Sequence, residues 1–253
     1  MIRAGRLLFR WRSFTPVPLV LLALPLLWRS RGPASPWWLW CGLALCVLGQ
    51  ALRAWVLGQV PDGTSGQNEK LTAVSLNSTG PYAWTRNPLY LGNFAITLGL
   101  CVVAHDALLL ALVAALFGLQ YRAIIAAEEE FLRGQFGPAY DAYCAKVPRF
   151  WPRPALHSGG AAAASGAAAR PWDFRRALRK EHNPAAAWVA LAIVLVAADR
   201  LRLSGLGVRV LWPFALALLV TAFIWLGIKG WKHRWLHGGF TEDLRRRLRD
   251  TAR

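Results

Sequence analysis

Two groups of polar side chains flank a pair of apolar segments, and together they could bind a charged small molecule. The group at the entry to the first segment consists of Tyr82, Arg86, Asn87 and Tyr90. The group after them consists of Glu128, Glu129 and Glu130. Carboxylates attract a cation, whereas a guanidinium and loop N–H groups attract an anion. The combination suits a zwitterionic or cationic ligand, and apolar walls beside it would admit a lipid tail.

The chain between the two groups predicts that they lie close together. Pro88–Ala104 and Ala107–Ile125 are apolar and are separated only by His105 and Asp106. We expect a tight helical hairpin, with Asp106 as the N-cap of its second helix. Because the connection is short, the start of the first helix and the end of the second meet at one end of the hairpin.

The composition indicates an integral membrane protein. The chain has 253 residues, of which 55% are hydrophobic and 17% charged, and its mean hydropathy is +0.31. The high apolar fraction excludes a disordered chain, and four Cys are too few for a disulfide framework. A net charge of +17 would also suit a nucleic-acid-binding protein, but the basic residues avoid the apolar runs, and 14 Trp favour a bilayer interface. We therefore predict a membrane partner and no nucleic acid.

Six apolar runs predict an all-α fold, a polytopic transmembrane helical bundle of about six spans. The runs are Phe14–Trp28, Trp37–Leu57, Pro88–Ala104, Ala107–Ile125, Ala185–Ala198 and Val210–Ile228. A hydrocarbon core of about 30 Å needs roughly 20 helical residues, so the first and fifth runs are short for a span. Three prolines are expected to kink the first run: Pro16, Pro18 and Pro25.

The basic residues also predict the orientation. With six spans both termini lie on one side, and 25 of the 30 Lys and Arg residues fall there. The other side carries five: Arg29, Arg31, Arg200, Arg202 and Arg209. The positive-inside rule then places both termini in the cytoplasm. The excess of Arg over Lys and the abundant Ala are typical of a GC-rich prokaryotic genome, so we predict a prokaryotic inner (cytoplasmic) membrane.

A linker of small residues divides the chain. Residues 157–170 read HSGGAAAASGAAAR and have no side chains that could form a core. We predict a membrane domain at residues 1–154 with its motif core at 58–154, a flexible Gly/Ala/Ser linker at 155–171, and two additional spans with a basic tail at 172–253. Glu181 and His182 are interpreted as a plain entry into the fifth span, and Thr241–Arg253 as a charged helical end.

Ordered motifs around the hairpin resemble a known group of membrane enzymes. In chain order they are Gly80-Pro81-Tyr82, Arg86-Asn87-Pro88-Leu89-Tyr90-Leu91-Gly92, Glu128-Glu129 with Leu132, Phe136-Gly137 with Tyr140 and Tyr143, and Val147-Pro148 with Pro152. The set resembles the isoprenylcysteine carboxyl methyltransferase and phospholipid methyltransferase group over about Gly58–Pro154. The polar segment Gly63–Asn68 adds a short further match to some prokaryotic members.

The resemblance implies an S-adenosyl-L-methionine-dependent methyltransferase with its cofactor pocket at the cytoplasmic end of the hairpin. Carried over to this chain, the cofactor-binding residues are Tyr82, Arg86, Asn87, Pro88, Tyr90, Gly92, Glu128 and Glu129, and the catalytic candidates are Arg86, Glu128 and Glu129. The family's usual His is Asn87 here. Asn forms hydrogen bonds but does not titrate near neutral pH, which leaves it a positioning role.

The same residues have structural interpretations. Arg86 could anchor a helix start at the membrane surface, and Tyr82 and Tyr90 could belong to an interfacial aromatic belt. Gly92 could simply permit close helix packing, the interpretation that we favour for it.

Two further sets of side chains receive structural interpretations alone. Phe136, Tyr140 and Tyr143 fit one amphipathic face, which favours packing. His233 and His237 share a helix face but lack a third ligand, so we predict no metal site.

The sequence leaves the methyl acceptor open. Carboxyl O-methylation of a prenylated cysteine or a similar lipidic acid needs no base, because a carboxylate is already ionised at about pH 7. N-methylation of a phospholipid headgroup amine needs a proton acceptor, such as Glu128 or Glu129. A non-enzymatic membrane scaffold or transport subunit is the third alternative, although intramembrane charge, which marks a transport path, is sparse here. The polar interruptions of the spans are Gln50, Arg53, Asn93 and Gln120.

Overall fold

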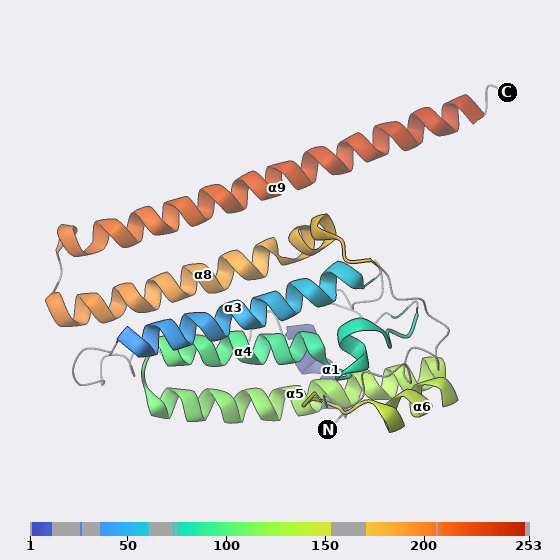
Figure 1. The fold of residues 1–253 in the computed structure, drawn as a ribbon, viewed down its shortest axis with the longest axis horizontal. Coiled ribbons are helices and arrows are strands. Elements are labelled where there is room, and N and C mark those ends of the chain that lie inside the picture. Colours follow the sequence, from blue (N-terminus) through green and yellow to red (C-terminus); the bar gives the residue numbers. More distant parts are fainter. Residues whose placement is uncertain are drawn as a thin grey trace.

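The computed structural model describes residues 2–11, 26, 36–60, 73, 75–152, 171–205 and 207–250, with the backbone alone for residues 11 and 233–250. Every regular element in these ranges is helical, which confirms the predicted all-α class. The elements are α1 (Ile2–Trp11), α3 (Pro36–Gln59), the 3₁₀ turn η1 (Gly80–Ala83), α4 (Pro88–Val103), α5 (Ala107–Phe136), α6 (Pro138–Lys146), α8 (Phe174–Ser204) and α9 (Val208–Asp250). The long helices form a layered row in the order α5, α4, α3, α8 and α9 (Figure 1).

Four of these helices are long and apolar enough to cross a membrane: α3, α5, α8 and the Val208–Lys232 part of α9. The third predicted run corresponds to α4, whose 16 residues extend only about 24 Å. The first run, Phe14–Trp28, lies outside the described residues apart from Leu26, so its crossing of the membrane stays a prediction. Residues 61–70, most of the linker and residues 251–253 also lie outside them.

Helices α3 and α4 pack backbone against backbone. A Cβ added to Gly49 would lie 2.6 Å from the carbonyl oxygen of Gly92, and one added to Gly92 would lie 2.9 Å from that of Gly49. Gly42 and Gly99 approach each other in the same way one heptad further along the two helices. Small residues allow such contact between apolar helices. The packing interpretation of Gly92 therefore agrees with the structure.

The predicted hairpin is present, and its turn is capped as expected. The side chain of Asp106 accepts a hydrogen bond of 2.8 Å from the backbone N–H of Leu109, which makes Asp106 the N-cap of α5. Helix α5 ends at Gly137, whose φ of 51° only glycine adopts readily, and Pro138 then starts α6. This corner folds α6 back beside the end of α5. Phe136, Tyr140 and Tyr143 pack together there, as predicted.

Helix α8 lies against α3, and α9 covers the outer side of α8 (Figure 1). Both helices are longer than the apolar runs that predicted them. Asp173 caps α8 by accepting from the N–H of Arg176, so the helix starts well before Ala185 and contains Pro184. Helix α9 continues beyond Ile228 to Asp250, which confirms a helical tail up to that residue.

Candidate functional site

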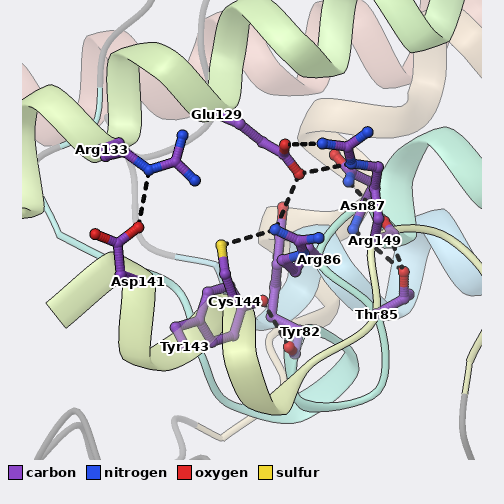
Figure 2. A network of polar contacts seen from close by, with 10 residues as sticks. All are labelled: Tyr82, Thr85, Arg86, Asn87, Glu129, Arg133, Asp141, Tyr143, Cys144 and Arg149. Atoms are coloured by element: carbon purple, nitrogen blue, oxygen red, sulfur yellow. Dashed lines mark hydrogen bonds and ion pairs between the residues drawn. The ribbon is translucent and has the colours of Figure 1, made fainter. Parts of the chain in front are cut away.

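The carboxylate of Glu129 is the centre of a polar cluster at one end of the bundle, where α3 ends and α4 begins; we call this end the site end. Glu129 comes from α5 and is 5% exposed. Arg86, from the residues that lead into α4, places Nη1 3.0 Å from its Oε1. Arg149, from the segment after α6, donates Nε to the same oxygen at 3.0 Å and Nη2 to Oε2. Figure 2 shows both guanidinium groups directed at this one carboxylate.

Arg86 is fixed from several directions. Its Nη1 also donates to Sγ of Cys144 at 2.7 Å, and its backbone N–H donates to the carbonyl of Pro148 at 2.9 Å. Its side chain is 14% exposed. The Nε–H of Arg86 is buried and has no hydrogen-bond partner within the described part of the chain. A buried donor of this kind is costly unless an acceptor reaches it.

The residues around Arg86 join two motifs that lie far apart in the sequence. Thr85 donates its hydroxyl to the carbonyl of Phe150 at 2.8 Å, and Asn87 donates its amide to the carbonyl of Arg149 at 2.7 Å. Together with the Arg86 backbone bond, three successive residues bind the carbonyls of three successive residues, 148–150. Asn87 thus holds the backbone of Arg149, a positioning role that needs no titrating group.

A second polar pair lies one residue away from Glu129. The hydroxyl of Tyr90 donates to Oε1 of Glu128 at 2.6 Å, which joins the start of α4 to α5. Burial, followed by the negative charge of Glu128, raises the pKa of Tyr82 well above its ordinary value. Tyr82 is therefore a neutral phenol at physiological pH. Its backbone carbonyl accepts from the hydroxyl of Tyr143 at 2.7 Å.

Aromatic rings form an apolar wall beside the two carboxylates. The ring of Tyr90 meets that of Tyr121 edge to face at a centroid distance of 4.6 Å, and Tyr121 stacks on Phe117 at 3.9 Å. Phe94 contacts both Phe117 and Phe150, which links this wall to the segment after α6. These packed rings form an apolar surface next to the hydrogen-bonded pair of Tyr90 and Glu128.

The predicted site residues thus divide into two sets. The structure brings Tyr82, Arg86, Asn87, Tyr90, Glu128 and Glu129 together at the site end. Pro88 is buried in the first turn of α4, and Gly92 lies in the contact between α4 and α3 rather than beside the carboxylates. Glu130 points away, since it is exposed and pairs with Arg6 at 3.4 Å.

Sequence reasoning missed three participants: Thr85, Cys144 and Arg149. Each adjoins or lies within one of the motifs described above, but the sequence alone does not indicate which residues they contact. The signal that could have found Arg149 is a basic residue directly after Val147-Pro148, in a motif that must pack near the glutamates. The cluster contains two guanidinium groups and two carboxylates, so it offers partners for a ligand that carries both positive and negative charge. Among the described residues no group of three or more His, Cys, Asp or Glu could hold a metal ion.

Comparison with known proteins agrees with the motifs. Residues 37–139 match the family model described as phospholipid methyltransferase, which confirms the resemblance for that segment. The family match and the apolar helices together indicate an integral membrane protein. No solved structure matches the chain.

Two curated relatives match a shorter part of the chain. The nickel-cobalt-cadmium resistance protein NccN of Alcaligenes xylosoxydans xylosoxydans is 38% identical over 84 residues, 33% of this chain and 39% of that protein. The cobalt-zinc-cadmium resistance protein CzcN of Cupriavidus metallidurans is 36% identical over 85 residues, 34% of this chain and 39% of that protein. The matched part therefore spans about two fifths of each relative.

Proposed function

We propose that this protein is an S-adenosyl-L-methionine-dependent integral membrane methyltransferase that methylates a lipidic or membrane-embedded acceptor. The observation that carries the proposal is the convergence of Arg86, Tyr90, Glu128 and Glu129 at one end of the α4–α5 hairpin. All four residues lie inside the segment that matches the phospholipid methyltransferase family model.

The residues at the site end fit the proposed cofactor. S-adenosylmethionine carries a sulfonium and an ammonium, both cationic, together with a carboxylate. The buried Nε–H of Arg86, which lacks a partner among the described residues, is a donor for an anionic oxygen. Glu128 and Glu129 supply negative charge for the cationic groups. We assign Arg86 to the carboxylate end of the cofactor and the two glutamates to its cations.

The chain's own residues have three tasks in such a reaction. The bound cofactor supplies a methyl group on a positively charged sulfur, ready for in-line displacement. Arg86, held by Glu129 and the Pro148 carbonyl, fixes the orientation of the ligand. The aromatic wall of Tyr90, Tyr121 and Phe117 excludes water from the reacting atoms. Tyr82 stays protonated, because its pKa is raised, and so adds no charge of its own to the site end.

The acceptor that we propose is a lipidic carboxylate, as in the isoprenylcysteine carboxyl O-methyltransferases. An ionised carboxylate needs no proton acceptor. A phosphatidylethanolamine-type amine is the alternative, and the description of the matching family favours it. In that case a proton must leave the amine, and Glu128, hydrogen-bonded to Tyr90, is the group placed to accept it.

Titration calorimetry with S-adenosylmethionine on the detergent-solubilised protein tests the proposal. Each charge-assisted hydrogen bond is worth roughly 1.5–3 kcal/mol, so Arg86→Ala and Glu129→Ala should weaken binding about ten- to a hundredfold. Arg133→Ala is the matched control, because Arg133 lies nearby in Figure 2 but pairs with Asp141 in an exposed position. Its affinity should equal that of the parent. If the parent does not bind the cofactor, a non-enzymatic membrane scaffold or transport subunit is left as the better description.

Transfer of a labelled methyl group distinguishes the acceptors. Vesicles that contain phosphatidylethanolamine test the amine, and a farnesylated cysteine analogue tests the carboxylate. The carboxylate product is a methyl ester, which alkali hydrolyses, whereas an N-methyl product survives alkali. Label in a base-labile product supports the O-methyltransferase proposal, and label in a base-stable phospholipid contradicts it in favour of the alternative.

A further inference from the structure

A second polar cluster lies inside the helix row, deeper than the site end. Arg53 of α3 and Glu181 of α8 form a two-pronged ion pair, with Nε to Oε2 at 2.9 Å and Nη2 to Oε1 at 2.7 Å. The side chains are 13% and 5% exposed. Gln50 donates to Oε2 of Glu181 at 2.6 Å and accepts from the indole N–H of Trp188 at 2.9 Å. Glu181 is therefore no plain entry into a span: it is a buried counter-ion.

Contacts run without a gap from this ion pair to the proposed cofactor site. Arg53 donates Nη1 to Oδ1 of Asn93, and Asn93 donates Nδ2 to the hydroxyl of Tyr121 at 3.2 Å. The ring of Tyr121 packs on Tyr90, whose hydroxyl binds Glu128. Four helices contribute to this chain of contacts, and α8 lies outside the segment that matches the family model.

Attachment of α8 to α3 does not depend on the ion pair alone. Trp172 donates its indole N–H to the carbonyl of Ala54 at 3.1 Å. The backbone N–H of Asp173 donates to the carbonyl of Gly58 at 3.0 Å, and Arg176 reaches the same carbonyl at 3.3 Å. The two bonds to Gly58 satisfy a carbonyl in the last turn of α3, where the helix itself supplies no donor.

The stability of the contact between α3 and α8 therefore does not by itself explain the Arg53–Glu181 ion pair. Burying two charges in an apolar bundle is costly, and a hydrophobic pair of similar size often stabilises a protein as well. What a hydrophobic pair would not supply is a donor for Asn93. The directional bonds from Arg53 to Asn93 and on to Tyr121 fix side chains that border the site.

We propose that Glu181 and Arg53 are positioning residues that hold Tyr90 and Glu128 in place for the cofactor, so that α8 completes the site from outside the family segment. The proposal rests on the proposed function. Loss of one charge should shift Asn93 and Tyr121 and lower cofactor affinity, although neither Glu181 nor Arg53 touches the ligand.

The test is cofactor titration of the full-length protein with a matched pair of variants on one helix. Glu181→Gln should raise the dissociation constant about threefold to thirtyfold, the range of energetic coupling through packed networks. Asp199→Asn is the control, since Asp199 is also a part-buried carboxylate of α8 that pairs with Arg202 at 2.7 Å and with His105 at 3.1 Å. His105 lies at the α4–α5 turn, the opposite end of the bundle from the site.

Thermal unfolding of the same samples separates positioning from stability. We expect both variants to lose stability and Glu181→Gln alone to lose affinity, while Glu181→Asp, which keeps the charge, should stay within about threefold of the parent. If Glu181→Gln does not fold, Asn93→Ala decides, because it removes the middle of the contact chain and leaves the ion pair intact. It should lower affinity in the same way.

The possible failures are distinguishable. A parent that does not bind S-adenosylmethionine overturns the proposed function and this assignment with it. A parent that binds, together with a Glu181→Gln or Asn93→Ala variant of equal affinity, overturns the positioning role and leaves the proposed function standing. Equal losses of affinity in Asp199→Asn and Glu181→Gln also overturn it, because the effect would then be one of general stability.

Discussion

The two guanidinium groups that bind Glu129 differ in how firmly they are held. The side chain of Arg86 is 14% exposed and that of Arg149 is 51% exposed. Hydrogen bonding to the Glu129 carboxylate raises the pKa of Arg149, so this guanidinium stays charged under all ordinary conditions. A ligand that needs the carboxylate can displace the exposed arginine more easily, because water compensates its charge. Under the proposed function, the ligand would displace Arg149 rather than Arg86 from Glu129.

Replacement of Arg149 should therefore have a smaller effect than replacement of Arg86. We expect Arg149→Ala to change the dissociation constant of S-adenosylmethionine by less than about tenfold, as for a half-exposed ion pair. Titration calorimetry beside Arg86→Ala measures the difference. An affinity loss for Arg149→Ala as large as that for Arg86→Ala would mean that Arg149 binds the ligand directly.

Three tyrosines near the site predict an alkaline limit to stability. Burial is the largest cause of the raised pKa of Tyr82, Tyr140 and Tyr143. Below the unfolded value of about 10, both states keep the proton and stability does not change. Above it the unfolded chain ionises while the folded chain does not, so the free energy of unfolding falls as pH rises.

Tyrosinate absorbance and circular dichroism, followed together from pH 9 upwards, check this limit. We expect the absorbance of these tyrosines to rise only as the helices unfold. Tyr140→Phe should make the fall in the free energy of unfolding with pH less steep, by at most the contribution of one proton. Ionisation of all five tyrosines near pH 10 in a protein that is still folded would contradict the expectation.

Part of the site could be predicted at the scale of residues. The order of the motifs placed Arg86 beside Glu129, because a short hairpin leaves those segments no other arrangement. Arg53 and Glu181 could not be paired in this way, since 128 residues separate them and neither belongs to a motif. A buried charge has to be paired, yet a sequence without an alignment does not say with which partner.

At the scale of elements, the close contact between α3 and α4 predicts that the same Gly→Ala change lowers stability inside the contact and raises it outside. A Cβ on Gly49 would lie 2.6 Å from a backbone oxygen of α4, whereas one on Gly118 of α5 would meet nothing within 4 Å. Gly49→Ala should therefore destabilise by about 1–3 kcal/mol through overpacking. Gly118→Ala should stabilise by about 0.5–1 kcal/mol, because it removes a glycine from a helix interior.

Thermal unfolding of both variants in one detergent measures these changes. Since the two substitutions add the same methyl group, their difference isolates the close contact from helix propensity. A stabilised Gly49→Ala variant would show that α3 and α4 lie further apart than described.

The apolar runs predicted the existence of the helices better than the residues at which the helices begin and end. Helix α5 continues past Ile125 to Phe136, and α8 starts at Phe174 rather than at Ala185. In both cases the additional turns are polar, so hydropathy alone does not detect them, although their residues favour helix and Asp173 supplies a cap. Glu128 and Glu129 of the proposed site and Glu181 of the buried ion pair all lie in these polar turns.

At the scale of the whole molecule, α8 and α9 predict that two distant points share one side of the membrane. Both helices are long and apolar enough to cross a membrane; if both do, the chain before α8 and the chain after α9 lie on the same side. The positive-inside rule, applied to the basic residues of those segments, predicts that this side is the cytoplasm. Reporter fusions at Gly160 and after Arg253 should both read cytoplasmic. A periplasmic reading at either point would contradict the arrangement.

The predicted domain boundary yields a final prediction about how the two parts of the chain hold together. The linker at residues 157–170 has no apolar side chains larger than Ala, so a protease should cut there first. The resulting fragments should nevertheless elute together in detergent. Their contacts include the Arg53–Glu181 ion pair and the bonds from Trp172 and Asp173 to the end of α3.

Size-exclusion chromatography of the nicked protein, followed by gel electrophoresis, measures this association. Trp172→Ala combined with Glu181→Gln removes a carbonyl partner and one charge of the pair, so this nicked variant should separate where the nicked parent does not. Arg133→Ala, far from this contact, should leave the fragments together. Separation of the parent's fragments would mean that α8 and α9 form an independent unit, in which case Glu181 could not hold the residues of the site in place.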